Sequence, residues 1–352
     1  MKGYLQLENG MTFEGELFGK IEEKVIGEVV FNTSMTGYQE ILTDPSYYGQ
    51  IVTMTYPLIG NYGVNFDYEQ SACCKARGFI VKEVSNKPNN FNNEMTLPDY
   101  LESEDITAIS GVDTRMLTKV LRNEGVMRGM ITTHMMPKTK LIEILDEFDN
   151  SKSVFSVSTS APFEVEGDKD GKHIVAIDYG IKANIINMFK QRGVNLTVVP
   201  FDTKAEDILK MNPDAVFLSN GPGDPADLPE CVEEIKKLIG KLPIIGICLG
   251  HQLASLALGG KTSKLKFGHR GGNHPVKNLD NEKVFMTSQN HGYVVDELPE
   301  GVEVTYRNIN DGSIEGMRCK DEKIYTIQFH PEACPGPYEG VHIFDEFLKV
   351  IE

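Results

Sequence analysis

The feature that most constrains the fold is a short apolar run, residues 243–247, which breaks at Gly246-Ile-Cys248-Leu-Gly250 and continues as a helical segment. A strand that turns sharply into a helix exposes the residue at the turn, and flanking glycines remove side chains that would crowd it. The free amides of the first helical turn and the helix dipole favour a thiolate there. The run therefore predicts a nucleophile elbow at Cys248, although a cysteine taken alone is more often a buried structural residue.

A base and an orienting group for this thiolate lie downstream. The β-rich run 324–329 ends in His330-Pro-Glu332. Proline fixes the local backbone, and side chains two apart on extended chain face the same way. We therefore expect Glu332 to meet one ring nitrogen of His330 while the other faces Cys248, as in a catalytic triad. The same tripeptide without the elbow is typical of a surface turn.

A third element is the turn Asn220-Gly221-Pro-Gly223-Asp-Pro225, which follows an apolar run at 215–218. Loops at the carboxyl ends of parallel strands line one crevice, so this turn is expected to face the elbow. The backbone amides of Gly221 and Leu249 are then the predicted oxyanion donors. A plain turn and a phosphate loop are the alternatives, but neither Gly-Lys-Ser/Thr nor Gly-x-Gly-x-x-Gly is present.

The pattern of the chain changes near residue 150. Residues 1–150 mix short strands with two helices, one capped by Asp113 and ending at Gly125, which predicts an α+β domain. Residues 151–172 are small, polar and charged, and we interpret them as a linker. From 173 to 352, apolar runs at 173–177, 196–199, 215–218 and 243–247 alternate with helical segments. This alternation predicts an α/β domain with a mostly parallel sheet.

Composition excludes several classes of protein. A chain of 352 residues suggests two domains, and 35 basic against 51 acidic residues, a net charge of −16, argue against nucleic-acid or membrane partners. No apolar run approaches the roughly 20 residues of a membrane span, and the first ten residues alternate like a strand rather than a signal peptide. Six cysteines without paired CxxC spacing fit a cytoplasmic protein. No metal is expected, because His269 and His274 lack acidic or thiol partners at ligand spacing.

Together with Gln289-Asn-His-Gly-Tyr293, these motifs resemble the triad-type (class I) glutamine amidotransferases. Further motifs resemble the small, glutamine-hydrolysing subunit of carbamoyl phosphate synthetase, and the resemblance covers nearly the whole chain. It implies an amino-terminal α+β small-subunit domain followed by a flavodoxin-like amidotransferase domain. The motifs are Thr33-Ser-Met-Thr-Gly-Tyr-Gln-Glu40, Asp44-Pro-Ser-Tyr47 and Phe267-Gly-His-Arg-Gly-Gly-Asn-His-Pro275.

The resemblance implies that Cys248, His330 and Glu332 hydrolyse glutamine to glutamate and ammonia. Ammonia would pass by an internal channel to a large synthetase subunit, which makes carbamoyl phosphate from bicarbonate and ATP. No cofactor is expected on this chain, since ATP and magnesium would belong to the large subunit. The implied glutamine contacts are Ser46, Gly221, Gly223, Leu249, Gln252, Asn290, Gly292 and Tyr293.

Some alternatives stay open. The chain could be the glutaminase subunit of a different synthetase, against which the amino-terminal motifs argue, or a non-catalytic assembly subunit, against which the intact triad argues. His291 is either a second base or a hydrogen-bonded structural histidine, and the role of Cys334 is open. The sequence does not distinguish whether the carbamoyl phosphate is used for arginine synthesis, for pyrimidine synthesis or for both.

Overall fold

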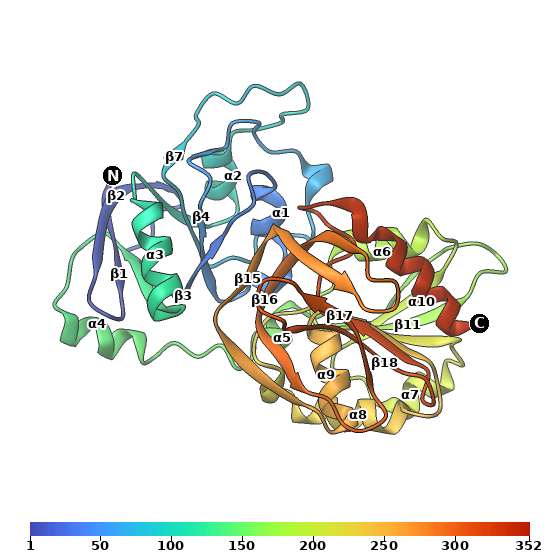
Figure 1. The fold of residues 1–352 in the computed structure, drawn as a ribbon. Coiled ribbons are helices and arrows are strands. Elements are labelled where there is room, and N and C mark those ends of the chain that lie inside the picture. The colour runs from blue at the N-terminus through green and yellow to red at the C-terminus, as the bar shows by residue number, and fades with distance from the viewer. The chain divides into compact units, whose positions relative to one another are not determined.

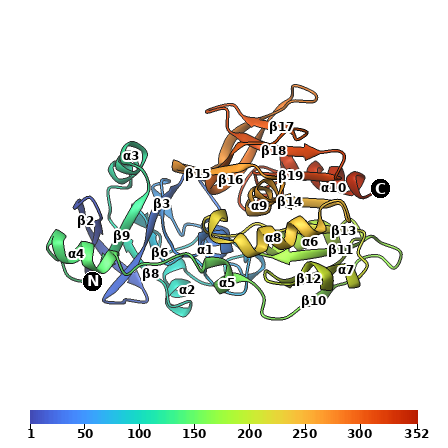
Figure 2. The same cartoon turned by 90° about the horizontal axis from the view of Figure 1, so that it is seen from below.

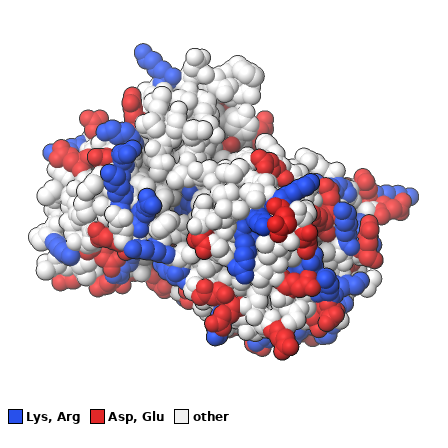
Figure 3. Space-filling model, viewed as in Figure 1, with Lys and Arg blue, Asp and Glu red and all other residues white.

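The computed structural model describes residues 1–352, which form two compact units, Met1–Asn150 and Ser151–Glu352 (Figure 1). On the face shown in Figure 3, acidic and basic side chains are interspersed. No helix combines the length and the apolar character that crossing a membrane requires.

The first unit is built on a closed barrel with the strand order β1-β2-β8-β6-β4-β3-β9. Its first two strands form a hairpin at Asn9-Gly10, where Gly10 takes a positive φ of 96° that suits glycine. The pairs β3–β4, β4–β6 and β6–β8 are parallel, and the others are antiparallel. The strands are β1 (Lys2–Leu7), β2 (Thr12–Gly19), β3 (Lys24–Asn32), β4 (Gln50–Met54), β6 (Gly78–Ile80), β8 (Thr107–Ser110) and β9 (Met127–Thr132).

The helices of the first unit pack against this barrel. In α3 (Thr114–Glu124) the side chain of Asp113 accepts from the amide of Met116 at 2.9 Å, and Gly125 ends the helix with φ 105°. The predicted cap and stop of this helix are thus confirmed. The other elements are α1 (Tyr38–Thr43), α2 (Leu97–Ser103), α4 (Lys138–Leu145) and a two-stranded sheet of β5 (Leu58–Ile59) and β7 (Glu83–Val84).

The second unit contains the predicted parallel sheet. Its parallel strands follow the order β12-β11-β13-β14-β19, the 2-1-3-4-5 order of flavodoxin-like folds. These strands are mostly apolar because both faces of the sheet are covered. They are β11 (His173–Asp178), β12 (Asn195–Pro200), β13 (Ala215–Leu218), β14 (Ile244–Ile247) and β19 (Ile324–Ile327).

Alternate residues of each strand enter different cores. Ile174 and Ala176 of β11 pack with α6 (Ala183–Lys190) and α10 (Ile343–Ile351), whereas Val175 and Ile177 pack with the helices of the other face. That second group comprises α7 (Ala205–Lys210), α8 (Pro229–Leu238) and α9 (Leu249–Leu258). Figure 2 shows the helices and strands of this unit from below. Helices on both faces confirm the doubly wound α/β arrangement.

An antiparallel region extends the sheet beyond β19 and had no counterpart in the sequence analysis. The strands β18, β16, β15 and β17 follow β19 in the sheet order, and the long hairpin of β15 and β16 pairs His269 with His291. This region carries part of the site described below. Its strands are β15 (Lys261–Asn278), β16 (Val284–Glu297), β17 (Glu303–Asn308) and β18 (Ile314–Cys319).

Residues 151–172, interpreted from sequence as a linker, hold regular structure within the second unit. They include α5 (Ser153–Val157) and β10 (Phe163–Val165), and β10 pairs antiparallel with β12 at the edge of the sheet. The amide of Thr159 donates to the buried carboxylate of Asp178 at 2.7 Å. Polar composition misled the interpretation, because an edge strand can pair through its backbone whatever its side chains are.

Candidate active site

Cys248 lies at the turn between β14 and α9, as the elbow predicts. Its backbone has φ 55° and ψ −107°, an uncommon conformation for a residue other than glycine, and its amide donates to the carbonyl of Ile327 at 2.8 Å. Such strain is concentrated at functional sites. Gly250 lets α9 approach β13 closely, since a Cβ there would clash with the carbonyl oxygen of Leu218. The local sequence thus presents one cysteine at the carboxyl end of the sheet.

His330 and Glu332 follow β19, the strand next to β14. Nδ1 of His330 lies 2.7 Å from Oε1 of Glu332, and both side chains are almost completely buried. The amide of His330 donates to the carbonyl of Ser288 at 2.9 Å, which ties this segment to β16. The other ring nitrogen, Nε2, forms no hydrogen bond of ordinary length and is available to the thiol and a substrate.

Lys182 is a functional residue that the sequence analysis missed. Its Nζ lies 2.9 Å from Oε1 of Glu332 and donates to the carbonyl of Ala333 at 2.7 Å, and its side chain is only 3% exposed. A buried lysine needs such a partner. The one signal in the sequence was its position just after β11, at the carboxyl end of a parallel strand.

The charges of Lys182, Glu332 and His330 stabilise one another. Burial opposes ionisation, but Lys182 and His330 outweigh it and hold the pKa of Glu332 down at about 2. Burial also lowers the pKa of His330, but Glu332 and Cys248 outweigh it and raise the pKa to about 10. Near neutral pH the site therefore holds a carboxylate against an imidazolium, which can give a proton to a leaving group.

The two residues predicted to supply the oxyanion donors lie in contact through the side chain of Leu249. A Cβ on Gly221 would clash with the carbonyl oxygen of Tyr179 and come within 2.9 Å of Cδ2 of Leu249, so only glycine fits there. The amide of Leu249 is at the first helical position, where an N–H has no partner within the helix. The amide of Gly250 is already used by the carbonyl of Ser219 at 3.0 Å. This leaves the Leu249 amide, beside the Gly221 turn, for a ligand.

The predicted glutamine contacts are divided among several elements. Sγ of Cys248 lies 3.7 Å from the carbonyl oxygen of Asn290 on β16, and Nε2 of Gln252 on α9 donates to the carbonyl of Tyr293 at 2.8 Å. The structure thus brings α9, β16 and the nucleophile together. Gly292 also lies on β16, Gly223 lies in the turn after β13 with φ 92°, and Ser46 lies in the first unit, in the short helix η1 (Pro45–Tyr47).

His291 has both ring nitrogens engaged. Nε2 lies 2.8 Å from Oε1 of Gln289, and Nδ1 lies 2.8 Å from the carbonyl oxygen of Tyr293. This favours the structural histidine over the second base. His269, for which the sequence offered no acidic neighbour, lies with Nε2 2.7 Å from Asp311 and Nδ1 3.6 Å from Glu315. The folding of distant strands, rather than local spacing, supplies these carboxylates.

Comparison with known proteins assigns each of the two units to a protein family. Residues 5–131 match the family described as carbamoyl-phosphate synthase small chain, CPSase domain, and residues 175–350 match glutamine amidotransferase class-I. The chain is 57% identical to the carbamoyl phosphate synthase small chain of Clostridium perfringens over 99% of both chains. It is 48% identical to the small chain of Clostridium acetobutylicum, over 99% of this chain and 100% of the relative. It is also 48% identical to the pyrimidine-specific small chain of Bacillus subtilis, over 100% of this chain and 96% of the relative.

Proposed function

We propose, because the chain belongs to the carbamoyl phosphate synthase small-chain family, that it hydrolyses glutamine through a Cys248–His330–Glu332 triad and supplies the ammonia to a large synthetase subunit. The single observation that carries the triad is the strained Cys248 at the carboxyl end of β14, together with the buried His330–Glu332 pair just after the neighbouring strand β19. Related small chains are the glutamine amidotransferase subunits of this synthase, and we infer the roles of the individual residues.

In the first half of the reaction, the thiolate of Cys248 attacks the side-chain carbonyl carbon of glutamine. The negative charge that develops on the carbonyl oxygen is stabilised by the amides of Gly221 and Leu249. His330 gives its proton to the amide nitrogen, so that the carbon–nitrogen bond breaks and ammonia leaves. Cys248 is left as a γ-glutamyl thioester.

In the second half, neutral His330 takes a proton from water, and the resulting hydroxide attacks the thioester. The carbon–sulfur bond breaks, glutamate leaves and the thiolate returns. Glu332 holds the imidazole by its Nδ1–H and stabilises the imidazolium. Lys182 compensates the buried carboxylate and holds the carbonyl of Ala333, which fixes the backbone after Glu332.

The remaining contacts and the partner belong to the same proposal. Asn290, Gly292 and Tyr293 on β16, with Gln252 on α9, Gly223 and Ser46, would supply the amides, carbonyls and neutral side chains that glutamine requires. The ammonia would pass through an internal channel to the large subunit, which would hold ATP and magnesium. We infer a cytoplasmic heterodimer from this coupling.

The test separates glutamine hydrolysis from synthesis. In the complex reconstituted with the large subunit, Cys248→Ser is expected to abolish glutamine-dependent carbamoyl phosphate formation, because a serine hydroxyl does not ionise as a thiol does. Formation from an added ammonium salt is expected to persist, which serves as the control for the activity of the large subunit. Loss of both activities would mean that Cys248 is structural. If the chain instead assembled with the large subunit of a different synthetase, that result would support the alternative function.

A further inference from the structure

Asp178, the last residue of β11, is a buried acidic residue that the proposed mechanism does not use. Its Oδ1 accepts from the backbone amides of Gly180 at 2.9 Å and Ile181 at 2.7 Å. Its Oδ2 accepts from the backbone amide of Thr159 at 2.7 Å. A backbone N–H can only donate, so both oxygens of Asp178 have to act as acceptors.

These hydrogen bonds hold the β11–α6 segment, which we define as residues 179–184. The bonds from Gly180 and Ile181 fold the backbone back onto the side chain of Asp178, two and three residues earlier, as an aspartate does at a turn. The bond from Thr159 ties the same side chain to the connection between α5 and β10. The course of the segment therefore depends on one carboxylate with three anchors.

One side of this segment contacts the turn that follows β13. The amide of Tyr179 donates to Oγ of Ser219 at 2.9 Å, and this hydroxyl donates to the carbonyl of Asn220 at 2.8 Å. The amide of Lys182 donates to Oδ1 of Asn220 at 3.3 Å. Gly221 lies so close to the carbonyl oxygen of Tyr179 that a Cβ would clash with it. The backbone of the β11–α6 segment thus sets where the Gly221 amide, a predicted oxyanion donor, lies.

The other side of the segment holds the acid of the predicted triad. Nζ of Lys182 lies 2.9 Å from Oε1 of Glu332 and donates to the carbonyl of Ala333 at 2.7 Å. Nδ2 of Asn184, in the first turn of α6, donates to the carbonyl of Glu332 at 2.6 Å. Glu332 in turn lies 2.7 Å from Nδ1 of His330. A shift of the segment would therefore move the carboxylate that orients His330.

We propose that Asp178 is a positioning residue, which anchors the β11–α6 segment and thereby sets the Gly221 amide and the Glu332 carboxylate at the same time. The strands β13 and β19 lie on either side of β14, so the segment contacts chain on both sides of the strand that ends at Cys248. The effect on glutamine hydrolysis rests on the proposed function, whereas the anchoring of the segment does not.

Both of these groups act on charge that develops during the reaction. The Gly221 amide would stabilise the oxyanion, and Glu332 would stabilise the imidazolium of His330. A displacement of about 1 Å in such groups can cost about 10²-fold in rate. Loss of an anchor is therefore expected to lower kcat more than it weakens the binding of glutamine.

The substitution Asp178→Asn removes an anchor and nearly keeps the size of the side chain. It replaces one of the two oxygens with an NH₂ group. Whichever way the amide turns, its nitrogen faces a backbone N–H, either that of Thr159 or those of Gly180 and Ile181. Two donors cannot form a hydrogen bond, so at least one anchor of the segment is lost.

Kinetics of the reconstituted complex test the positioning role. Asp178→Asn is expected to lower kcat for glutamine hydrolysis about ten- to hundredfold and to change the KM for glutamine less than about threefold. The rate is expressed per folded molecule, with the folded fraction taken from urea unfolding of the same sample. A purely structural residue would lower the free energy of unfolding and leave kcat per folded molecule at the parent value, and that result would overturn the proposal.

Amide hydrogen exchange of the full chain, followed by mass spectrometry, tests the anchoring without reference to activity. Faster exchange is expected in Asp178→Asn for the peptides that cover 159, 179–182 and 219–221, because their amides lose a fixed partner or a fixed neighbour. Exchange at parent rates in these peptides would overturn the proposal. If Cys248→Ser remained active, the proposed function would fail, whereas the exchange rates would still decide whether Asp178 anchors the segment.

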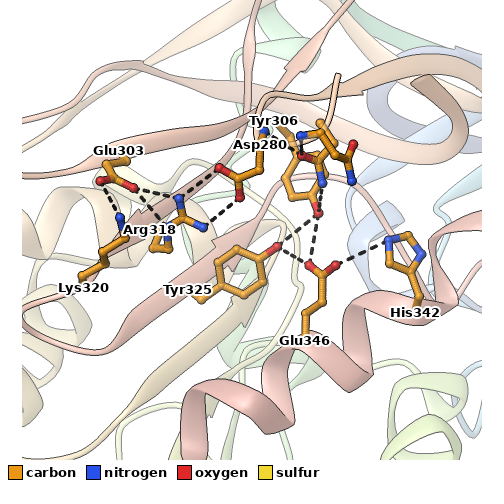
Figure 4. Close-up of polar contacts among 10 residues, drawn as sticks. Asp280, Glu303, Tyr306, Arg318, Lys320, Tyr325, His342 and Glu346 are labelled. Carbon is orange, nitrogen blue, oxygen red and sulfur yellow. Dashed lines mark hydrogen bonds and ion pairs between the residues drawn. The ribbon is translucent and has the colours of Figure 1, made fainter. Parts of the chain in front are cut away.

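Glu346→Gln is the matched control, the same chemical change elsewhere in the second unit (Figure 4). Oε2 of Glu346 on α10 accepts from the hydroxyl of Tyr325 at 2.6 Å and from that of Tyr306 at 3.2 Å. Both hydroxyls meet the same oxygen, so glutamine can keep both bonds. We expect kcat, KM and the exchange of 179–182 to stay at the parent values. A loss of kcat equal to that of Asp178→Asn would overturn the specific role of Asp178.

Ser219→Ala keeps the proposal testable if Asp178→Asn does not fold. It removes only the hydroxyl that links the amide of Tyr179 to the carbonyl of Asn220. Loss of this one connection is expected to lower kcat about three- to tenfold, with KM close to that of the parent. An unchanged kcat per folded molecule would mean that the segment does not position the oxyanion turn, which would overturn the proposal.

Discussion

The second unit contains two fully buried glutamates, Glu332 and Glu315, whose surroundings differ. Glu332 lies against two positive groups, Lys182 at 2.9 Å and His330 at 2.7 Å. Glu315 accepts from two neutral amides, and its one positive neighbour, His269, is more distant at 3.6 Å. Glu332 therefore balances buried positive charge, whereas Glu315 is held by hydrogen bonds from neutral amides.

The largest effect is expected when His330, the proposed acid and base next to Glu332, is replaced. His330→Asn keeps a hydrogen-bonding side chain but cannot carry a proton between groups. Glutamine hydrolysis in the reconstituted complex is expected to fall about 10²–10⁴-fold with little change in glutamine binding. Steady-state glutamate release and equilibrium binding measure the two quantities. Turnover close to that of the parent would remove His330 from the mechanism and favour His291.

A smaller effect is expected when the charge compensation of Glu332 is removed. Lys182→Met keeps the aliphatic stem and leaves the carboxylate with His330 alone, which we expect to lower the free energy of unfolding by about 3 kcal/mol. Lys172→Met, in the exposed pair with Asp214, is the matched control and should cost about 1 kcal/mol or less. Urea unfolding of both variants gives the comparison, and equal losses would contradict it.

The pH dependence of this variant has a definite sign. Because Lys182 and His330 lower the pKa of Glu332 to about 2, ionised Glu332 stabilises the fold above the unfolded value of about 4.3. That contribution is lost as the pH falls toward 2. Without Lys182 the pKa of Glu332 rises, so acid unfolding of Lys182→Met should begin at a higher pH than in the parent. An unchanged acid limb would mean that Lys182 does not act on Glu332.

The smallest effect is that of Glu315→Gln, which replaces one oxygen that faces an amide with a nitrogen and keeps the shape of the side chain. Gln289 precedes Asn290, a predicted glutamine contact, so a carboxylate that only orients its neighbours should change the KM for glutamine of the reconstituted complex by about three- to tenfold rather than abolish turnover. A loss of kcat as large as that of His330→Asn would mean that Glu315, like Glu332, stabilises a charge that turnover requires.

Local patterns predicted what depends on neighbours in sequence. The elbow around Cys248 and the helix between Asp113 and Gly125 are encoded by glycines and caps that act within a few residues. The parallel strands of the second unit were likewise predictable, because strands buried on both faces are mostly apolar.

Contacts between distant segments were not predictable in the same way. Lys182 reaches a carboxylate 150 residues away in the chain, and Glu315 meets Gln289 and Asn308 only because β16, β17 and β18 lie in one sheet. The closed barrel of the first unit was missed for the same reason, since periodicity reveals a strand but not its pairing partner.

The most direct test of the central claim is to capture the covalent intermediate. The reconstituted complex is mixed with glutamine, quenched in acid during turnover and digested, and the peptides are analysed by mass spectrometry. The account predicts a γ-glutamyl group on the peptide that contains Cys248 and none in Cys248→Ser. A γ-glutamyl group on another cysteine, such as Cys334, or turnover without any adduct on Cys248, would contradict it.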